Sequence, residues 1–367
     1  QGDRPRSHLA RLGYGVTVFE SAPEIGGLLR SGIPEFRLPD DVVDREINRI
    51  LDLGVAVRSK HSVDRPALLE LAGNHDAVLV ATGQQALRDL QLGMNGVDAV
   101  VQGIDFLDHV HHNNVRVDGE DVVVIGGGNT AMDAARSALR LGAESVRVVY
   151  RRTRDEMPAI GEEIEEALEE GVVIDYLTQP VTLHDEATDG IRRHYTLTCR
   201  RMELGEPDAS GRRAPQEIAG SDFDLACHRI ILALGQSPDL SVFPEGTEVR
   251  EGTELLGLLE TPVFAIGDLA TREGTVAAAI GSGRRSAARI HTVLSGESLP
   301  ITEHADASRD VDIWKDEVIR ADAMKLHLFE RQAGSEGESL PVSQRRSTFD
   351  EVHMGLETSA EAARSTS

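Results

Sequence analysis

A glycine-rich segment, Gly126 to Ala131, has residue types and spacing that suit the binding of a phosphate group. Gly126 permits a tight turn, Gly128 lets the backbone approach a pyrophosphate, and Ala131 allows a helix to pack closely on a sheet. Asn129 and Thr130 open the predicted helix, whose first backbone N–H groups can donate to an anion. This pattern is a weak signal by itself, so the elements around it decide its meaning.

A βαβ unit of about 30 residues surrounds the glycine segment. Residues 122–125 form a buried apolar strand, residues 132–141 have helical spacing before Gly142, and residues 146–150 form the next strand. This arrangement is the mononucleotide-binding unit of Rossmann-like domains. The alternative interpretation is a glycine turn that binds no ligand.

Two arginines follow the second strand of this unit, at the position that usually selects between the nicotinamide dinucleotides. An NAD site usually has Asp or Glu there to bind the ribose 2′-hydroxyl. Arg151 and Arg152 instead present guanidinium groups, which suit a 2′-phosphate. We therefore predict that the unit binds NADPH. In the alternative, both arginines are surface charges that pair with Glu156 and Glu162.

A second group of residues, spread along the chain, stands at strand ends, glycine turns and helix starts. Its members are Glu20, Gly27, Leu28, Gly83, Gly267, Asp268, Thr275 and Val276. Glu20 ends a predicted strand and can accept a hydrogen bond from an adenosine ribose. An Asp that follows a strand, such as Asp268, is more often a helix cap than a ligand. The order of these residues around the NADPH unit nevertheless favours a second dinucleotide site.

Four stretches resemble the two-dinucleotide flavoprotein reductases, in particular the small subunit of NADPH-dependent glutamate synthase and the NADPH half of dihydropyrimidine dehydrogenase. They are residues 24–39, 124–133, 150–159 and 265–268. The segment GGGNTAMD followed by YRRTRDEMPA is the most specific of them, and the resemblance extends over about residues 9–295.

The resemblance implies an α/β fold, glutathione-reductase-like, with two Rossmann-like dinucleotide-binding domains and an irregular acidic C-terminal tail. An FAD domain, residues 1–94 and 239–298, is split by an inserted NADPH domain, residues 95–238. The tail, residues 299–367, is expected to be loosely attached. Positions such as Arg37, together with Glu20, Gly27, Leu28, Gly267, Asp268 and Thr275, would contact FAD. NADPH would contact Gly128, Asn129, Thr130, Arg151 and Arg152.

The implied reaction is hydride transfer from NADPH to FAD and electron transfer to a partner, either a protein subunit or an iron–sulfur domain. This chemistry belongs to the cofactors and demands no side-chain acid or base, so we predict no catalytic residue. Cys199 and Cys227 form no CxxC pair, which argues against a thiol–disulfide reductase and against an iron–sulfur site in this chain. The residues around Glu156 to Pro158 are placed where a loop could order over the nicotinamide.

The sequence departs from the family at both ends. When residues 9–13 are aligned with the family's first helix, Gly2 falls near the third glycine of a GxGxxG loop. The strand and the two glycines before it are then missing, and with them the loop that cradles the FAD pyrophosphate. Residues 349–364 resemble the approach to a cysteine cluster, but serine and threonine follow. The alternative function is therefore a non-catalytic NADP(H)-binding protein, or a truncated homologue that has lost FAD binding.

Charge and hydropathy exclude other classes. The net charge of −24 argues against nucleic-acid binding and against an anionic membrane surface. No apolar run spans a bilayer and no signal peptide is visible, so we expect a cytoplasmic protein. Of the 38 basic residues 35 are Arg, a bias that a high-salt cytoplasm or a GC-rich genome explains equally well. His109, His111 and His112 show no metal-binding spacing and are expected in a solvated surface linker.

Overall fold

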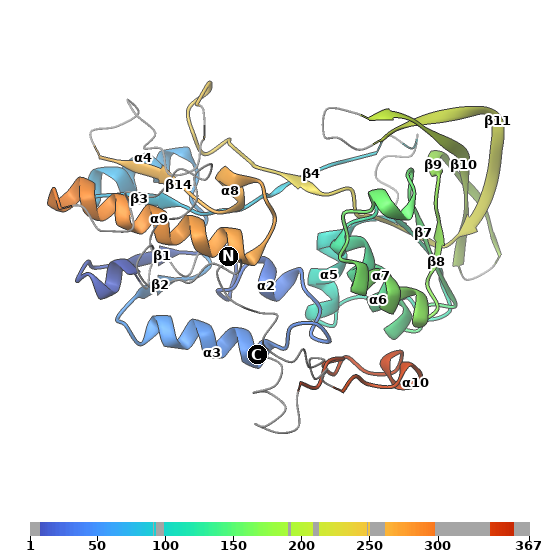
Figure 1. Cartoon of the computed structure of the whole chain (residues 1–367), viewed down its shortest axis with the longest axis horizontal. Helices are drawn as coiled ribbons and strands as arrows, with labels where there is room; N and C mark the ends of the chain where they lie inside the picture. Colours follow the sequence, from blue (N-terminus) through green and yellow to red (C-terminus); the bar gives the residue numbers. More distant parts are fainter. Residues whose placement is uncertain are drawn as a thin grey trace, which may run out of the picture.

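The computed structural model describes residues 8–90, 92, 99–189, 192–207, 213–247, 249, 261–297 and 338–355. Two lobes built on short parallel strands lie side by side, joined by two extended segments (Figure 1). These connecting segments contain β4 (Ala86–Leu87) and β13 (Gln236–Ser237), which pair antiparallel. The expected α/β fold is confirmed. Gly2, residues 356–364 and the predicted domain boundaries at 94/95 and 298/299 lie outside the described residues.

The first lobe is termed the NADPH lobe below, after the nucleotide that the sequence predicts for it. It contains a five-stranded parallel sheet. In spatial order its strands are β5 (Val100–Gln102), β12 (Arg229–Leu232), β6 (Asp121–Ile125), β7 (Ser145–Val149) and β8 (Val173–Asp175). Successive side chains of a strand point to opposite faces, so Val122 and Val124 join one core while Val123 and Ile125 join another. The apolar run at 122–125 is therefore buried on both faces, as the sequence predicts.

Different elements cover the two faces of this sheet. Three helices cover one face: α5 (Gly103–His111), α6 (Asn129–Arg140) and α7 (Gly161–Glu169). A three-stranded antiparallel sheet covers the other: β9 (Thr178–Asp189), β10 (Arg192–Pro207) and β11 (Arg213–Cys227). Both β9 and β11 pair antiparallel with β10, which is the central strand of this sheet.

The second lobe is termed the FAD lobe, after the cofactor that the sequence predicts for it. Its described residues contain two separate pairs of parallel strands. β1 (Thr17–Phe19) pairs with β2 (Ala56–Arg58), and β3 (Val78–Val80) pairs with β14 (Val263–Ala265). Its helices include α2 (Leu28–Ser31), α3 (Asp40–Leu51), α4 (Arg65–Asn74), α8 (Asp268–Thr271) and α9 (Val276–Ser295). β14 and β3 are far apart in the sequence, so the lobe is assembled from both sides of the NADPH lobe.

The described part of the C-terminal region, residues 338–355, packs against both lobes. It contains α10 (Val342–Arg345) and a β-bridge between Ser339 and His353. Val352 is only 1% exposed, and its N–H donates to the carbonyl of Phe36 at 3.0 Å. The expectation of a loosely attached tail is wrong for these residues, because they bury apolar side chains and make hydrogen bonds to the lobes.

None of the helices in the described part of the chain has the length and apolar character needed to cross a membrane. The cytoplasmic location stays a prediction from the sequence.

Candidate functional site

The glycine turn of the NADPH lobe connects β6 to α6. Gly126 has φ +148°, and a Cβ there would lie 2.2 Å from the carbonyl oxygen of Ala233. A Cβ at Gly127 would lie 2.5 Å from the ring of Tyr150. Neither position tolerates a side chain, so both glycines are required by the packing of the turn.

Gly128, the third glycine, has different surroundings. It caps the N-terminus of α6, and the nearest atom to a Cβ placed there is a carbon of Pro158 at 4.0 Å. The first turn of a helix leaves backbone N–H groups without intrahelical partners, and these groups favour an anion. Ala131 is fully buried in the turn that follows. Open space beside exposed N–H donors is what a pyrophosphate requires, so these residues fit NADPH.

The segment after β7 folds back over this turn. The Ala159 N–H donates to the Gly127 carbonyl at 3.1 Å, and the Ile160 N–H donates to Oδ1 of Asn129 at 2.9 Å. The Tyr150 hydroxyl donates to the carbonyl of Glu156 at 2.7 Å. Asn129 is thereby held in place, while Thr130 packs near Gly103 at the start of α5. The residues around Pro158 lie over the glycine turn; their contact with nicotinamide stays a prediction.

The two arginines at the end of β7 differ in exposure. Arg151 is exposed. Arg152 is buried, and its Nε donates to the carbonyl of Arg213 in β11 at 2.8 Å. Glu156, a partner suggested by the alternative interpretation, forms an ion pair with Arg213 at 2.7 Å. Arg151 is therefore the better placed of the two for a phosphate that approaches from solvent.

A cavity of about 580 Å³ lies in the FAD lobe between the two strand pairs. All residues of β1 and of β3 line it, so the unpaired edges of both strands face the same space. We call the residues predicted above for a second dinucleotide site the flavin set. Four of them also line the cavity: Glu20, Gly27, Leu28 and Gly83. Gly27 and Gly83 have φ of +55° and +72°, and no atom lies within 4 Å of a Cβ at Gly83. A cavity with glycine turns and an acidic group at a strand end fits a dinucleotide.

The other predicted members of this set do not line the cavity and lie at the start of two helices. Gly267 caps α8, and Thr275 caps α9 by accepting a hydrogen bond from the Ala278 N–H at 3.2 Å. Asp268 is buried and accepts from the Gly274 N–H at 3.0 Å; burial raises its pKa against the effect of that hydrogen bond. Val276 is exposed. Because β3 and β14 pair in parallel, their carboxyl ends bring Gly83 and Gly267 to one edge.

Arg37 is directed toward the NADPH lobe. Its Nη1 donates to both carboxylate oxygens of Asp133 in α6, at 2.9 and 2.8 Å, and its Nε lies 2.5 Å from Glu163 in α7. The predicted contact of Arg37 with FAD stays a prediction. Its ion pairs with α6 and α7 were not predicted from the sequence. Residues 96 positions apart give no local signal of such a pair.

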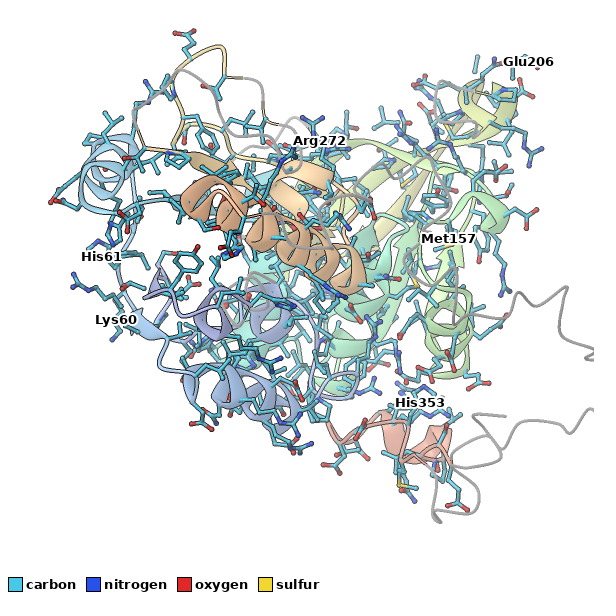
Figure 2. The ribbon with its side chains drawn as sticks, turned by 60° about the vertical axis from the view of Figure 1, so that its left-hand side comes forward. Lys60, His61, Met157, Glu206, Arg272 and His353 are labelled. Carbon is cyan, nitrogen blue, oxygen red and sulfur yellow. The ribbon has the colours of Figure 1, made fainter. Side chains whose placement is uncertain are left out.

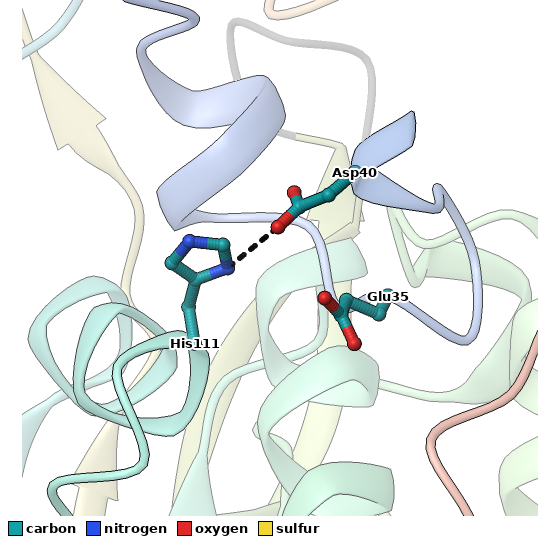
Figure 3. A group of neighbouring side chains, drawn as sticks. All are labelled: Glu35, Asp40 and His111. Carbon is teal, nitrogen blue, oxygen red and sulfur yellow. Dashed lines mark ion pairs between the residues drawn. The ribbon is translucent and has the colours of Figure 1, made fainter. Parts of the chain in front are cut away.

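Sequence reasoning also missed a polar group at the boundary of the lobes. Glu35 and Asp40 of the FAD lobe and His111 of α5 place ligand atoms within 4.8 Å of one another (Figure 3). His111 Nδ1 lies 3.7 Å from Asp40, whose second neighbour is Arg30 at 3.5 Å. Burial and the nearby Asp40 carboxylate raise the pKa of Glu35. The expectation of a solvated linker is wrong for His111, which ends a helix and contacts the other lobe.

The fold and the two sites define a two-domain, dinucleotide-binding reductase. Residues 44–283 match the pyridine nucleotide-disulphide oxidoreductase family. The chain belongs to this family, and the predicted resemblance is confirmed. It is an oxidoreductase family whose flavoprotein members use FAD and NADP(H), as predicted.

Two relatives show the extent of the similarity. The chain is 36% identical to the beta subunit of NADP(+)-dependent formate dehydrogenase from Moorella thermoacetica, over 95% of this chain and 50% of that protein. It is 36% identical to a putative small chain of NADPH glutamate synthase from Cereibacter sphaeroides, over 80% of this chain and 75% of that protein. The chain thus spans about half the length of the first of these curated relatives.

Solved structures establish the glutathione-reductase-like fold class. FprA, an oxidoreductase of Mycobacterium tuberculosis, superposes with a TM-score of 0.62 at 18% identity, covering 80% of this chain and 82% of FprA. Thioredoxin reductase of T. acidophilum superposes with a TM-score of 0.55 at 15% identity, covering 80% and 95%. At these identities the likeness concerns the fold alone.

Proposed function

We propose that this chain is an NADPH-dependent flavin oxidoreductase of the glutamate synthase small-subunit type. Residues 95–238 bind NADPH, and residues 1–94 with 239–298 bind FAD. The observation that carries the proposal is the pair of sites: open space at Gly128 before a helix N-terminus, and a cavity whose lining includes Glu20, Gly27 and Gly83. When bound, the cofactors supply the chemistry, in which a hydride leaves NADPH and reduces FAD.

The protein's contribution is binding and orientation. The N-terminus of α6 holds the pyrophosphate of NADPH, and Arg151 pairs with its 2′-phosphate. Asn129, held by the Ile160 N–H, fixes the segment that covers the glycine turn. In the FAD lobe, Glu20 accepts from a ribose hydroxyl. The N-termini of α8 and α9 direct backbone N–H groups toward the flavin and its phosphates.

The electrons pass from FAD to a partner subunit or an iron–sulfur domain. Support comes from relatives that are themselves subunits, such as the beta subunit of NADPH-Fe(3+) oxidoreductase from Geobacter sulfurreducens, 36% identical over 81% of this chain. The thiols of this chain do not support a disulfide reductase, because burial raises the pKa of both Cys199 and Cys227 to about 12. Such thiols stay protonated at neutral pH and are poor nucleophiles.

A second candidate is an NADP(H)-binding protein that does not hold FAD. It is favoured by the cavity between β1 and β3, because the edges of these strands face each other without pairing in the described part of the chain. In this second candidate, the two strand pairs of the FAD lobe do not form the continuous sheet on which a flavin would bind.

An absorbance titration separates the two candidates. Purified protein is incubated with FAD, freed of unbound flavin and mixed with NADPH without oxygen. The proposed oxidoreductase retains flavin and loses its absorbance near 450 nm within seconds, faster with NADPH than with NADH. Protein that retains no flavin but binds NADPH, seen as a change in nucleotide fluorescence, contradicts the proposal and supports the second candidate.

A further inference from the structure

One short segment of the FAD lobe, residues 35–40, contacts three helices of the NADPH lobe. It follows α2, ends at the first residue of α3 and contains Glu35 and Asp40, which form the polar group with His111 described above. Phe36, Arg37 and Asp40 each reach a different helix or pair of helices of the other lobe. We call residues 35–40 the anchor segment.

Phe36 is fully buried between charged groups. The guanidinium carbons of Arg140 and Arg136 lie 3.9 and 4.7 Å from its ring centroid. Both arginines bind the buried carboxylate of Glu170, with Nη2–Oε1 distances of 3.0 and 2.9 Å. Stacking of a guanidinium on an aromatic face is attractive, and more so where water is excluded. The ring is thus held by helix α6, which carries both arginines.

Arg37, the residue after Phe36, also binds helix α6. Asp133, its partner, is 2% exposed and lies one helical turn after the N-terminus of α6. The glycine turn that faces the proposed NADPH site is at the start of this helix. Arg37 in turn follows the cavity-lining turn at Gly26–Leu28 by about ten residues. One ion pair therefore connects the proposed nucleotide-binding helix with the proposed flavin-binding turn.

The C-terminal segment 338–355 covers the outside of this junction. Thr348 accepts from Nε of Arg140 at 3.1 Å, and Phe349 packs on Phe36 with ring centroids 6.2 Å apart. His353 of this segment faces the NADPH lobe (Figure 2), with its Nε2 2.9 Å from Glu166 in α7. Both lobes and the C-terminal segment thus contact one another around Phe36.

We infer that the Arg37–Asp133 pair is a positioning contact for hydride transfer, which holds helix α6 at a fixed place relative to the flavin-binding segment. Asp133 and Arg37 act through the two lobes and need not touch the reacting atoms. The inference rests on the proposed function for its chemical consequence. The physical reason is that hydride transfer needs the two reacting rings at near-attack distance. Without the pair, the lobes must first move into that arrangement, and this conformational step then limits the rate.

The test compares Asp133→Ala with the conservative Asp133→Asn and with Arg45→Gln, which removes an exposed pair with Asp41 within α3. Rapid-mixing experiments measure the limiting rate of flavin reduction and the apparent Kd for NADPH. The same reactions with NADPH deuterated at C4 and in viscous buffer report whether a conformational step limits the rate. X-ray scattering of the cofactor-free protein measures the separation of the lobes.

We expect Asp133→Ala to slow flavin reduction at least about tenfold, with Kd changed less than about threefold. Its isotope effect falls and its rate becomes sensitive to viscosity. Asp133→Asn, which still accepts a hydrogen bond, recovers part of the rate, and Arg45→Gln behaves as the wild type. An unchanged rate in a folded Asp133→Ala protein, or a slower rate with an unchanged isotope effect and unchanged viscosity dependence, overturns the inference.

The scattering measurement keeps the two proposals separate. If the wild-type protein takes up no FAD, the proposed function fails, but a larger radius of gyration of Asp133→Ala still supports the anchor. If flavin is bound and reduced while the radius and the rate are unchanged by Asp133→Ala, the proposed function stands and the positioning contact is refuted.

Discussion

Each of the two lobes forms a candidate dinucleotide site, but the segments that form it are arranged differently along the chain. In the NADPH lobe, β6, the glycine turn and α6 follow one another within 20 residues, and the central strands are buried on both faces. In the FAD lobe, the unpaired edges of β1 and β3 face a cavity. The strand that pairs with β3 is β14, which follows the whole NADPH lobe in the sequence. The first site is shaped by local packing, and the second by segments brought together over long distances.

The difference extends to the forces that hold each site. Around the NADPH lobe, a buried ion network joins Arg136 and Arg140 to Glu170. Burial opposes the ionisation of Glu170, but hydrogen bonds from the two arginines lower its pKa. Around the FAD cavity, apolar side chains pack together, such as those of Leu9 and Ile290, which both line it. The NADPH lobe is therefore expected to be the more sensitive to loss of a single polar group.

Glu170→Gln gives the largest expected effect. Removal of one partner from a buried ion network costs about 3–5 kcal/mol, because the remaining charges lose their counter-ion. Urea unfolding of the full chain, followed by circular dichroism, measures the loss. The exposed pair of Glu46 with Arg49 in α3 provides the control, since Glu46→Gln should change the free energy of unfolding by less than about 0.5 kcal/mol. Equal effects of the two variants would remove the contrast between the lobes.

A pair of glycine substitutions compares the two turns directly. Gly126→Ala forces a methyl group against the Ala233 carbonyl at a positive φ, and should destabilise the chain by about 3 kcal/mol through strain and overpacking. Gly83→Ala meets open space and should cost only the backbone strain, about 1 kcal/mol. Thermal unfolding of both variants checks this order, and a Gly83→Ala protein that is the less stable of the two contradicts it.

Arg151→Ala tests whether the NADPH site recognises the 2′-phosphate of the nucleotide. Loss of a charge-assisted contact with the 2′-phosphate should weaken NADPH binding about tenfold, or about 1.4 kcal/mol, and leave NADH binding unchanged. Fluorescence titration with each nucleotide provides the measurement. Arg154→Ala is the matched control, because Arg154 is on the same loop but pairs with Glu165. Equal weakening toward both nucleotides would refute a role in phosphate recognition.

The pH dependence of stability tests the buried ionisable group at the contact between the lobes. Burial raises the pKa of Asp133 to about 7, against the attraction of Arg37. In the unfolded chain an aspartate titrates near 3.9. Between these values the folded state holds the extra proton, so stability from this group is full below about pH 4 and is lost as the pH rises to about 7. The slope is at most about 1.4 kcal/mol per pH unit.

Comparison of the wild type with Asp133→Asn isolates this contribution. Urea unfolding at pH 4.5, 6 and 7.5 should give a free energy that falls less steeply with pH in the variant than in the wild type. A difference between the two proteins that stays constant across this range would show that Asp133 does not titrate in it.

The elements of the NADPH unit could be predicted because their signals are local. The apolar run at 122–125, the glycines and the helix that follows are neighbours in the sequence, and α6 and β7 formed within two or three residues of the expected bounds. The end of the chain was less predictable. Residues 338–355 are polar on average, and the burial of Val352 depends on Phe36, far away in the sequence.

The sequence by itself determined the class of fold, the glycine turn and the arginines that follow it, because hydrophobic period and turn chemistry act between close neighbours. Only the tertiary structure decided which arginine is exposed, which strand edges face the cavity and where Arg37 points. No hydrophobic period and no motif predicts the ion pair between Arg37 and Asp133, since its partners meet only when the two lobes pack. Its energy depends on burial, and burial is a property of the assembled fold.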